Sequence, residues 1–215
     1  AGAVTLLRKD HENRGRNLFA ANCASCHRYN GHDGRGYPLD DAQSAPELAG
    51  FASVEWITKL LNHEHYISEE YFGGTKFKNG TMARKVLAKY TAEEIALLPR
   101  IATLLSDMAE LPYQTPLSED EREELLALFY NDDLVFQDGL ACIDCHDIDS
   151  EEEGYAPDLT GYGSDEWTIA FLENPEDERF YGDENDRMPC YGRDGKLTDE
   201  EIKIISDWIR SRPSE

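Results

Sequence analysis

The sequence predicts a mostly α-helical protein built from two similar domains. The first observation is an internal repeat, because a series of short motifs occurs twice in the same order. The second is a set of helix start signals, in which Ser or Thr is followed three residues later by Glu. The third is that the alternating pattern of a β-strand is almost absent. These observations predict two helical domains in tandem.

Four pairs of segments define the repeat. They are Cys23–His27 and Cys142–His146, Ala45–Phe51 and Ala156–Tyr162, Ser53–Trp56 and Ser164–Trp167, and Tyr71–Gly73 and Phe180–Gly182. Each copy then reaches a methionine, Met82 in the first and Met188 in the second. The segment 111–116 contains two prolines between helical patterns, which is typical of a linker. We therefore expect a first domain at residues 1–114 and a second at residues 115–215.

Three capping boxes support the helical prediction: Thr91–Glu94, Ser118–Glu121 and Thr198–Glu201. Apolar residues at helical spacing follow each box. They are Ile95, Leu98, Ile101, Ala102 and Leu105; Leu125, Leu128 and Phe129; and Ile202, Ile205, Trp208 and Ile209. We expect a helix after each box, and shorter helices before each Cys pair and from Trp56 and Trp167.

The composition limits the partners and the location of the chain. Its 44 acidic and 21 basic residues give a formal net charge of -23, which excludes nucleic acid as a partner. The acidity serves either solubility or the steering of a basic protein partner. The apolar fraction is 40%, which is small for two independent cores, so each domain needs an apolar group to pack around. No apolar run approaches the length of a membrane span, and the first ten residues do not resemble a signal peptide.

The repeated C-x-x-C-H motif carries the chemistry. Its residues are Cys23, Cys26 and His27 in the first copy, and Cys142, Cys145 and His146 in the second. In this motif the two thiols add to the vinyl groups of a haem, and the adjacent histidine becomes the proximal iron ligand. The sequence therefore predicts two covalently bound haem c groups. A zinc site made from the four cysteines would leave both histidines unexplained, and a redox dithiol would need a nearby βαβ pattern.

The sixth ligand decides whether a haem carries electrons or does chemistry. A thioether opposite the histidine closes the site and raises the potential. Met188 lies in a Gly- and Asp-rich loop before the last helix, and Met82 occupies the matching position in the first copy. We predict that His27, Met82, His146 and Met188 are the iron ligands. The alternatives in the first domain are His63, His65 and Met108.

The residues after each motif are candidates for supporting contacts. A proximal histidine needs an acceptor for its other ring N–H, and we propose the backbone carbonyls of Pro46 and Pro157, although these prolines also suit a simple loop wall. Trp56 and Trp167 are candidate hydrogen-bond donors to the haem propionates, with core packing as the equal alternative. For Tyr71 and Tyr181 packing is favoured. The fifth cysteine, Cys190, has no evident partner, and we expect it to pack beside the haem rather than to act as a reactive thiol.

These residues resemble class I c-type cytochromes in tandem. In that family a first helix precedes C-x-x-C-H, an Ala-Pro-x-Leu-x-Gly loop follows, a Met loop caps the iron, and the last helix crosses the first. Gly15 and Phe19 occupy the positions where such a first helix packs against the last one. The resemblance covers nearly the whole chain and implies electron transport by haem iron.

A narrower resemblance is to the dihaem cytochrome domain associated with or fused to cytochrome b in bacterial Rieske/cytochrome b complexes. It rests on Leu7–Asp10, Cys23–Gly34, Tyr71–Thr75 and Phe180–Pro189. It implies a soluble electron exit for a quinol-oxidising respiratory complex, with that complex as donor and a basic-surfaced acceptor. Haem c is attached outside the cytoplasm, so we expect a periplasmic or equivalent location, with any tether supplied by the complex or by a missing segment.

The function expected from these residues is therefore electron transfer, with no catalytic residues. The main alternative is an enzyme, a dihaem peroxidase with one open haem. If Met82 were not a ligand, the insertion near Glu69 and Glu70 would supply its acid/base pocket. A third possibility is a sensor that binds a small gas at one open iron. Both alternatives require an iron without a closed sixth position.

Overall fold

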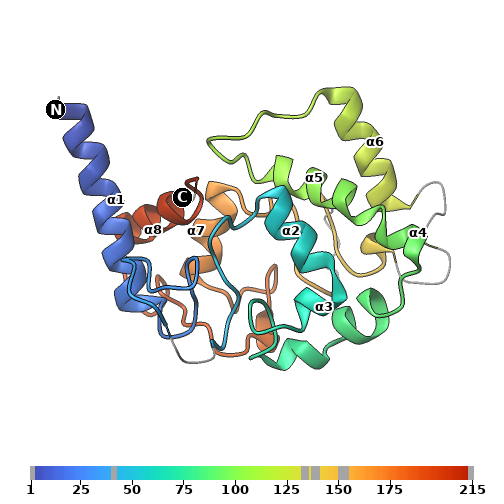
Figure 1. Ribbon diagram of the computed structural model, residues 1–215, viewed down its shortest axis with the longest axis horizontal. Coiled ribbons are helices and arrows are strands. Elements are labelled where there is room, and N and C mark those ends of the chain that lie inside the picture. The colour runs from blue at the N-terminus through green and yellow to red at the C-terminus, as the bar shows by residue number, and fades with distance from the viewer. Residues whose placement is uncertain (1–2, 40–42, 132–135, 137–140, 150–154, 213–215) are drawn as a thin grey trace.

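The computed structural model describes residues 3–39, 43–131, 136, 141–149 and 155–212. Its helices are α1 (Ala3–Asn22), α2 (Val54–Leu61), α3 (His63–Tyr66), α4 (Ala92–Ile95), α5 (Leu98–Met108), α6 (Glu119–Tyr130), α7 (Asp165–Glu173) and α8 (Asp199–Ile209) (Figure 1). Shorter helical turns lie at Lys76–Asn79, Met82–Leu87, Cys142–Asp144 and Gly182–Glu184. In the described ranges β pairing is confined to isolated bridges between residues 29 and 38. The predicted mostly helical fold is confirmed.

Side-chain caps fix where the helices begin, and the two repeats use the same ones. Ser53 accepts a hydrogen bond from the backbone N–H of Trp56 at 3.2 Å, and Ser164 accepts one from that of Trp167 at 3.1 Å. Each bond satisfies one of the free donors of a first helical turn, so α2 and α7 begin at equivalent positions. The three predicted capping boxes are also present, at the starts of α4, α6 and α8.

The helix predicted after Thr91 is divided in two. The Thr91 capping box starts the four-residue α4, and the chain then turns before α5 begins at Leu98. Pro99 lies in the first turn of α5. Proline lacks an N–H and its ring clashes with the carbonyl four residues earlier, so it is tolerated at the start of a helix and not in its interior. Pro99 therefore marks the start of a second helix, where the spacing of apolar residues alone predicted one continuous helix.

The first helix packs against the last one. A Cβ atom added to Gly15 in α1 would lie 2.5 Å from the Cβ atom of Trp208 in α8, so only glycine allows this close approach. The ring of Trp208 lies 5.1 Å from that of Phe19 and 4.1 Å from that of Tyr29, centroid to centroid. Figure 1 shows the blue and red ends of the chain side by side. Together with α7, these helices form one packing unit.

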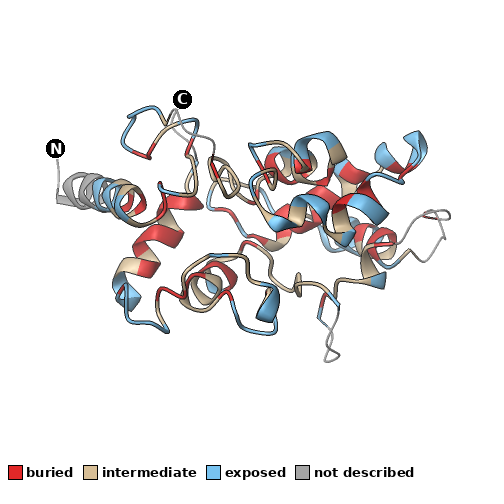
Figure 2. Ribbon diagram, turned by 90° about the horizontal axis from the view of Figure 1, so that it is seen from below, coloured by how far each residue is buried: buried red, intermediate tan, exposed pale blue. Residues whose placement is uncertain are grey.

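The second packing unit is formed by the helices from the middle of the chain. In it α5 packs against both α2 and α6. Asp107 in α5 is buried; its carboxylate accepts a hydrogen bond from the backbone N–H of Leu117 at 2.8 Å and pairs with Arg122 in α6 at 2.5 Å. Figure 2 shows the buried residues concentrated on the faces that the helices turn toward one another.

The helix pairing therefore crosses the repeat. Within a self-contained tandem, α1 would pair with α5 and α6 with α8, whereas the main contacts are α1 with α8 and α5 with α6. The boundary between residues 114 and 115 remains a prediction about how the repeat divides in sequence. The packing units of the structure do not follow that division.

The two units meet where the repeats have equivalent residues. Ala52 and Gly163 both have left-handed backbone, with φ of 62° and 73°, and a Cβ atom on Gly163 would lie 2.5 Å from that of Ala52. The buried Arg210 spans this junction, donating to the carbonyl oxygens of Gly163 at 2.9 Å and Ala109 at 2.8 Å. The C-terminus of α8 is thereby tied to the end of α5. In the parts of the chain that are described, no helix is long and apolar enough to cross a membrane.

Candidate functional site

The first C-x-x-C-H motif, Cys23–His27, continues directly from the end of α1. The backbone N–H of Cys23 donates to Phe19 and that of His27 donates to Cys23, each at 2.8 Å. These helical bonds hold the motif as one compact turn at the end of α1. Cys23 is buried, and this burial raises the pKa of its thiol to about 12. The first motif therefore presents a neutral thiol at the end of α1.

The second motif, Cys142–His146, forms a similar turn after α6. The backbone N–H of His146 donates to the carbonyl of Cys142 at 2.9 Å. Burial raises the pKa of the Cys142 thiol to about 12 as well. The hydroxyl of Tyr130, the last residue of α6, donates to the carbonyl of Ile148 at 2.8 Å and holds the residues after the motif against that helix. The two motifs thus have the same local geometry.

Both histidines are oriented by the proline carbonyls that the sequence suggests. His27 Nδ1 lies 2.7 Å from the carbonyl oxygen of Pro46, and His146 Nδ1 lies 2.8 Å from that of Pro157. A carbonyl oxygen only accepts, so Nδ1 carries the proton and Nε2 keeps its lone pair for a metal. Burial lowers the pKa of both histidines, against the opposing effect of these hydrogen bonds. Each ring is therefore held neutral and in a fixed orientation, with Nε2 able to bind a metal.

A tryptophan packs against the loop after the motif in each of the two repeats. The indole N–H of Trp56 donates to the carbonyl oxygen of Glu47 at 2.7 Å, and that of Trp167 points to Asp158 at 3.4 Å. Both indole donors therefore face the loop backbone. This geometry favours the packing alternative, in which the tryptophans position the Pro46 and Pro157 loops, and a contact with the haem propionates stays a prediction. Tyr71 likewise donates to the carbonyl of Trp56, at 3.0 Å.

Glu47 is a residue whose importance the sequence analysis missed. Its carboxylate accepts hydrogen bonds from the backbone N–H groups of Asn30, Gly31 and Ala49, at 2.7, 3.1 and 2.9 Å. It thereby joins the segment after the first motif to the loop that contains Pro46. The only signal in the sequence was an acidic residue at this position of both copies, Glu47 and Asp158.

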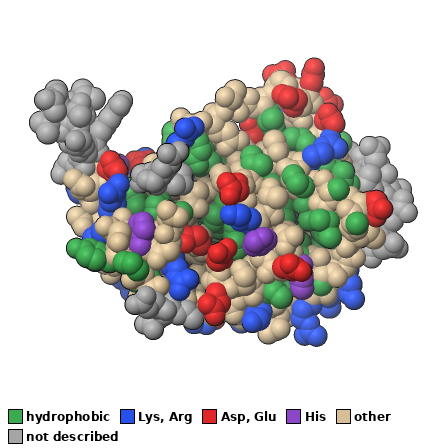
Figure 3. Space-filling view, in the orientation of Figure 1, with side chains coloured by type: hydrophobic (Ala, Val, Ile, Leu, Met, Phe, Trp, Pro, Cys, Tyr) green, Lys and Arg blue, Asp and Glu red, His purple; other side chains and the backbone are tan. Residues whose placement is uncertain are grey.

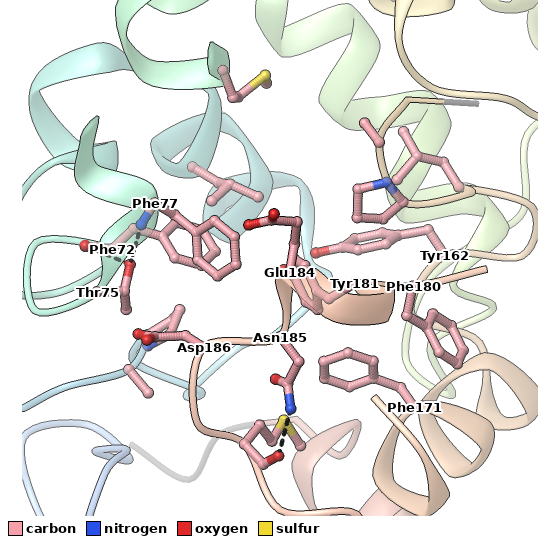
Figure 4. Close-up of a pocket in the computed structure, with 18 of the residues that line it drawn as sticks. Phe72, Thr75, Phe77, Tyr162, Phe171, Phe180, Tyr181, Glu184, Asn185 and Asp186 are labelled. Carbon is pink, nitrogen blue, oxygen red and sulfur yellow. Dashed lines mark hydrogen bonds between the residues drawn. The ribbon is translucent and has the colours of Figure 1, made fainter. Parts of the chain in front are cut away.

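A single continuous cavity of about 1210 Å³ lies between the two motifs. It exceeds the usual range of small-molecule pockets, roughly 300 to 1,000 Å³. Residues of both motifs line it, and Met82 and Met188 line it as well. Figure 4 shows aromatic side chains from both repeats around it. Those labelled are Phe72, Phe77, Tyr162, Phe171, Phe180 and Tyr181.

The rival ligands of the first repeat do not border this cavity. His63, His65 and Met108 are absent from its lining; His65 is exposed, and Met108 packs against the apolar cluster around α5. Glu69 and Glu70, the candidates for a peroxidase acid/base, are exposed and are also absent from the lining.

Among the described residues no three His, Cys, Asp or Glu side chains are placed to hold a metal together, so the zinc alternative has no cluster. Cys190 is 2% exposed, and burial raises the pKa of its thiol. It is buried within the protein but is absent from the cavity lining, and its predicted position beside a haem stays a prediction.

The residues present fit a haem at each motif. Each motif offers two thiols and a neutral imidazole at the wall of a largely apolar cavity, and a thioether borders the same cavity. This donor set is that of a c-type haem protein. Comparison with known families matches the cytochrome c family twice, at residues 12–99 and 133–213. The chain belongs to the cytochrome c family. No curated protein and no solved structure matches it.

Proposed function

We propose that the chain is a dihaem electron carrier with one haem c on each motif. His27 and His146 would be the proximal ligands, and Met82 and Met188 the distal ones. The observation that carries the proposal is the one cavity bordered by both motifs and both methionines. The haem supplies the one-electron chemistry of its iron when bound.

The chain's own residues set the environment of that iron. With a haem bound, the aromatic lining would exclude water from it, and a low-dielectric site would disfavour the more highly charged oxidised state. The hydrogen bonds from His27 and His146 to the proline carbonyls fix the ring orientation and strengthen the ligand. Because the two motifs share one cavity, the haems would lie near each other, and an electron entering at one would pass to the other inside the protein.

We further propose that the donor is a quinol-oxidising Rieske/cytochrome b complex and that the chain works on the outer side of the membrane, in the periplasm or its equivalent. The resemblance of the segments around both motifs to the dihaem domain of such complexes supports this donor. The net charge of -23 supports an acceptor with a basic surface. Acidic side chains gather at the start of α6, at the top right of Figure 3, where the first turn contains Glu119, Asp120 and Glu121.

A redox titration of the purified protein, followed optically, tests the carrier function. We expect two haems per chain by mass, two one-electron steps, and a red sulfur-to-iron band in the oxidised state with the intensity of two thioether ligands. A high-spin haem without this band would contradict the carrier and would favour a peroxidase or a sensor.

The partners are tested separately. Reduction by quinol through an isolated Rieske/cytochrome b complex should be fast, whereas quinol alone should reduce the protein slowly. Electron transfer to a basic acceptor should slow as salt rises, because exposed charges more than about 8 Å apart are screened at physiological ionic strength. A rate that is independent of salt would contradict electrostatic steering.

A further inference from the structure

The sequence leaves open which methionine faces which histidine. Each repeat contains one of each, and in a self-contained domain the two would ligate the same iron. The structure allows the pairing to be read from what surrounds each motif. This inference rests on the proposed function, since it assigns ligands to haems that the motifs bind.

The surroundings of the first motif come from the second repeat. Cys23, Ala24 and Tyr29 belong to one buried cluster with Leu172, Tyr191 and residues of α8, and Met188 packs against this cluster. Tyr191, three residues after Met188, donates from its hydroxyl to the carbonyl oxygen of Asn22 at 2.6 Å. The loop that contains Met188 is therefore bonded directly to the residue that precedes Cys23.

The surroundings of the second motif come from the first repeat. Ala141 and Ile148, on either side of the motif, are buried in a cluster with residues of α2 and α5. Cys142 and Met82 both pack against that cluster, and Met188 does not. Tyr90, in the segment after Met82, packs its ring on Phe136 with 5.3 Å between centroids, just before the second motif. The loop that contains Met82 therefore lies beside the second motif.

The path of the chain explains this arrangement. It leaves the first packing unit near Phe51 and returns to it near Tyr162, at equivalent positions of the two repeats. The helix and motif at the start of each repeat consequently pack with the methionine loop and last helix of the other. The packing of α1 against α8 and of α5 against α6 follows the same rule, because each pair joins a helix of one repeat to a helix of the other.

We propose that the distal ligands are exchanged between the repeats: Met188 ligates the haem on the first motif opposite His27, and Met82 ligates the haem on the second motif opposite His146. Each haem would then be held from one face by one repeat and from the other face by the other. The two sites would form a single interlocked structure.

Single-haem proteins test the exchange. In the full-length chain, Cys142→Ala with Cys145→Ala leaves only the haem of the first motif. In this background we expect Met188→Leu to abolish the red sulfur-to-iron band and Met82→Leu to leave it intact. The reverse result would overturn the exchange and would establish pairing within each repeat. The matched background, Cys23→Ala with Cys26→Ala, should give the opposite dependence on the two methionines.

A second measurement avoids the need for single-haem variants to fold. The reduced dihaem protein is labelled with ¹³C at the methionine methyl groups, and contacts between these methyls and the haems are read by NMR. Each haem is identified by its thioether protons. A contact between Met188 and the haem of Cys23 supports the exchange, and a contact with the haem of Cys142 overturns it. If no methionine methyl is shifted by a haem, thioether ligation itself fails, which is a failure of the proposed function rather than of the pairing.

Discussion

The rings of Phe51 and Tyr162, which occupy equivalent positions in the two repeats, pack against each other with their centroids 5.9 Å apart. The chain crosses from one packing unit to the other at both residues. The junction is thus a contact between two copies of the same turn. Arg210, just after α8, also bridges the junction by donating hydrogen bonds to the carbonyl oxygens of Gly163 and Ala109.

Replacing Arg210 should loosen the junction. Arg210 is 7% exposed and donates to the carbonyls of Gly163, Ala109 and Glu110. Arg210→Met keeps much of the apolar stem but leaves buried carbonyls without their donor, so we expect a loss of about 2 to 4 kcal/mol in the free energy of unfolding. Denaturant unfolding measures this. Arg14→Met, which removes an exposed ion pair with Glu200, is the control and should cost less than about 1 kcal/mol. Equal losses in the two variants would contradict the role of Arg210.

Gly15 should tolerate no larger residue. Gly15→Leu places a side chain where the Cβ atom alone meets Trp208 at 2.5 Å, so α1 and α8 must separate. Overpacking of this kind costs about 3 kcal/mol. Asn17→Leu adds the same side chain at an exposed position of α1 and serves as the control. Thermal unfolding compares the two, and a Gly15→Leu protein as stable as the control would show that the helices do not pack closely.

The two tryptophans should differ in their contribution to stability. The Trp56 indole lies 2.7 Å from its carbonyl acceptor and the Trp167 indole 3.4 Å from its own. Substitution by phenylalanine removes the indole N–H and a similar side-chain volume at both positions. The difference between the two losses of stability therefore reports the difference between the two hydrogen bonds. We expect Trp56→Phe to be the more destabilising variant, by about 1 kcal/mol. Urea unfolding of both variants measures it, and an equal or reversed order would contradict the expectation.

The loop after the first motif should weaken in acid. Burial alone would raise the pKa of Asp33, but hydrogen bonds from the Arg35 side chain and from the backbone of Arg35 and Tyr37 outweigh it and hold the pKa below its ordinary value. A depressed pKa means that this stabilisation is present above the ordinary Asp pKa, about 3.9, and is lost as the pH falls through the folded value.

Asp33→Asn tests this dependence. The variant should be less stable than the parent protein at pH 7, and the difference should narrow below about pH 4. Unfolding by urea at the two pH values measures both differences. Asp183→Asn, at an exposed position, is the control and should change the stability by less than about 0.5 kcal/mol at pH 7. A difference that stays constant with pH would contradict the role of the Asp33 carboxylate.

Local features were predictable from the sequence because they depend on neighbouring residues. The capping boxes, the serines that start α2 and α7, and the histidine hydrogen bonds to Pro46 and Pro157 all follow from short patterns. The division of the helix at Pro99 was equally readable from the proline, although the apolar spacing hid it. The bond from Trp56 to Glu47 was not readable, because an indole can donate to any acceptor within reach.

The exchange of helices between the repeats could not be predicted from the sequence, for a different reason. Gly15 and Phe19 require a partner of the right shape, and each repeat ends in a helix with a suitable apolar face. Because the two repeats carry similar patterns, the sequence does not determine whether the first helix of a repeat packs against the last helix of the same repeat or of the other one. The choice is made by the route of the chain between Phe51 and Tyr162, which is a property of tertiary structure.

The packing of α1 on α8 also sets the order in which the protein can be completed. The helix that a ribosome makes early has its partner almost two hundred residues later, so contacts of very long sequence separation must form before the first unit closes. Until α8 docks, the face of α1 that contains Gly15 and Phe19 lacks its packing partner, and Cys23 lacks the cover of the cluster to which α8 contributes. The topology therefore puts the closure of the first unit, and with it the burial of the first motif, after the synthesis of α8.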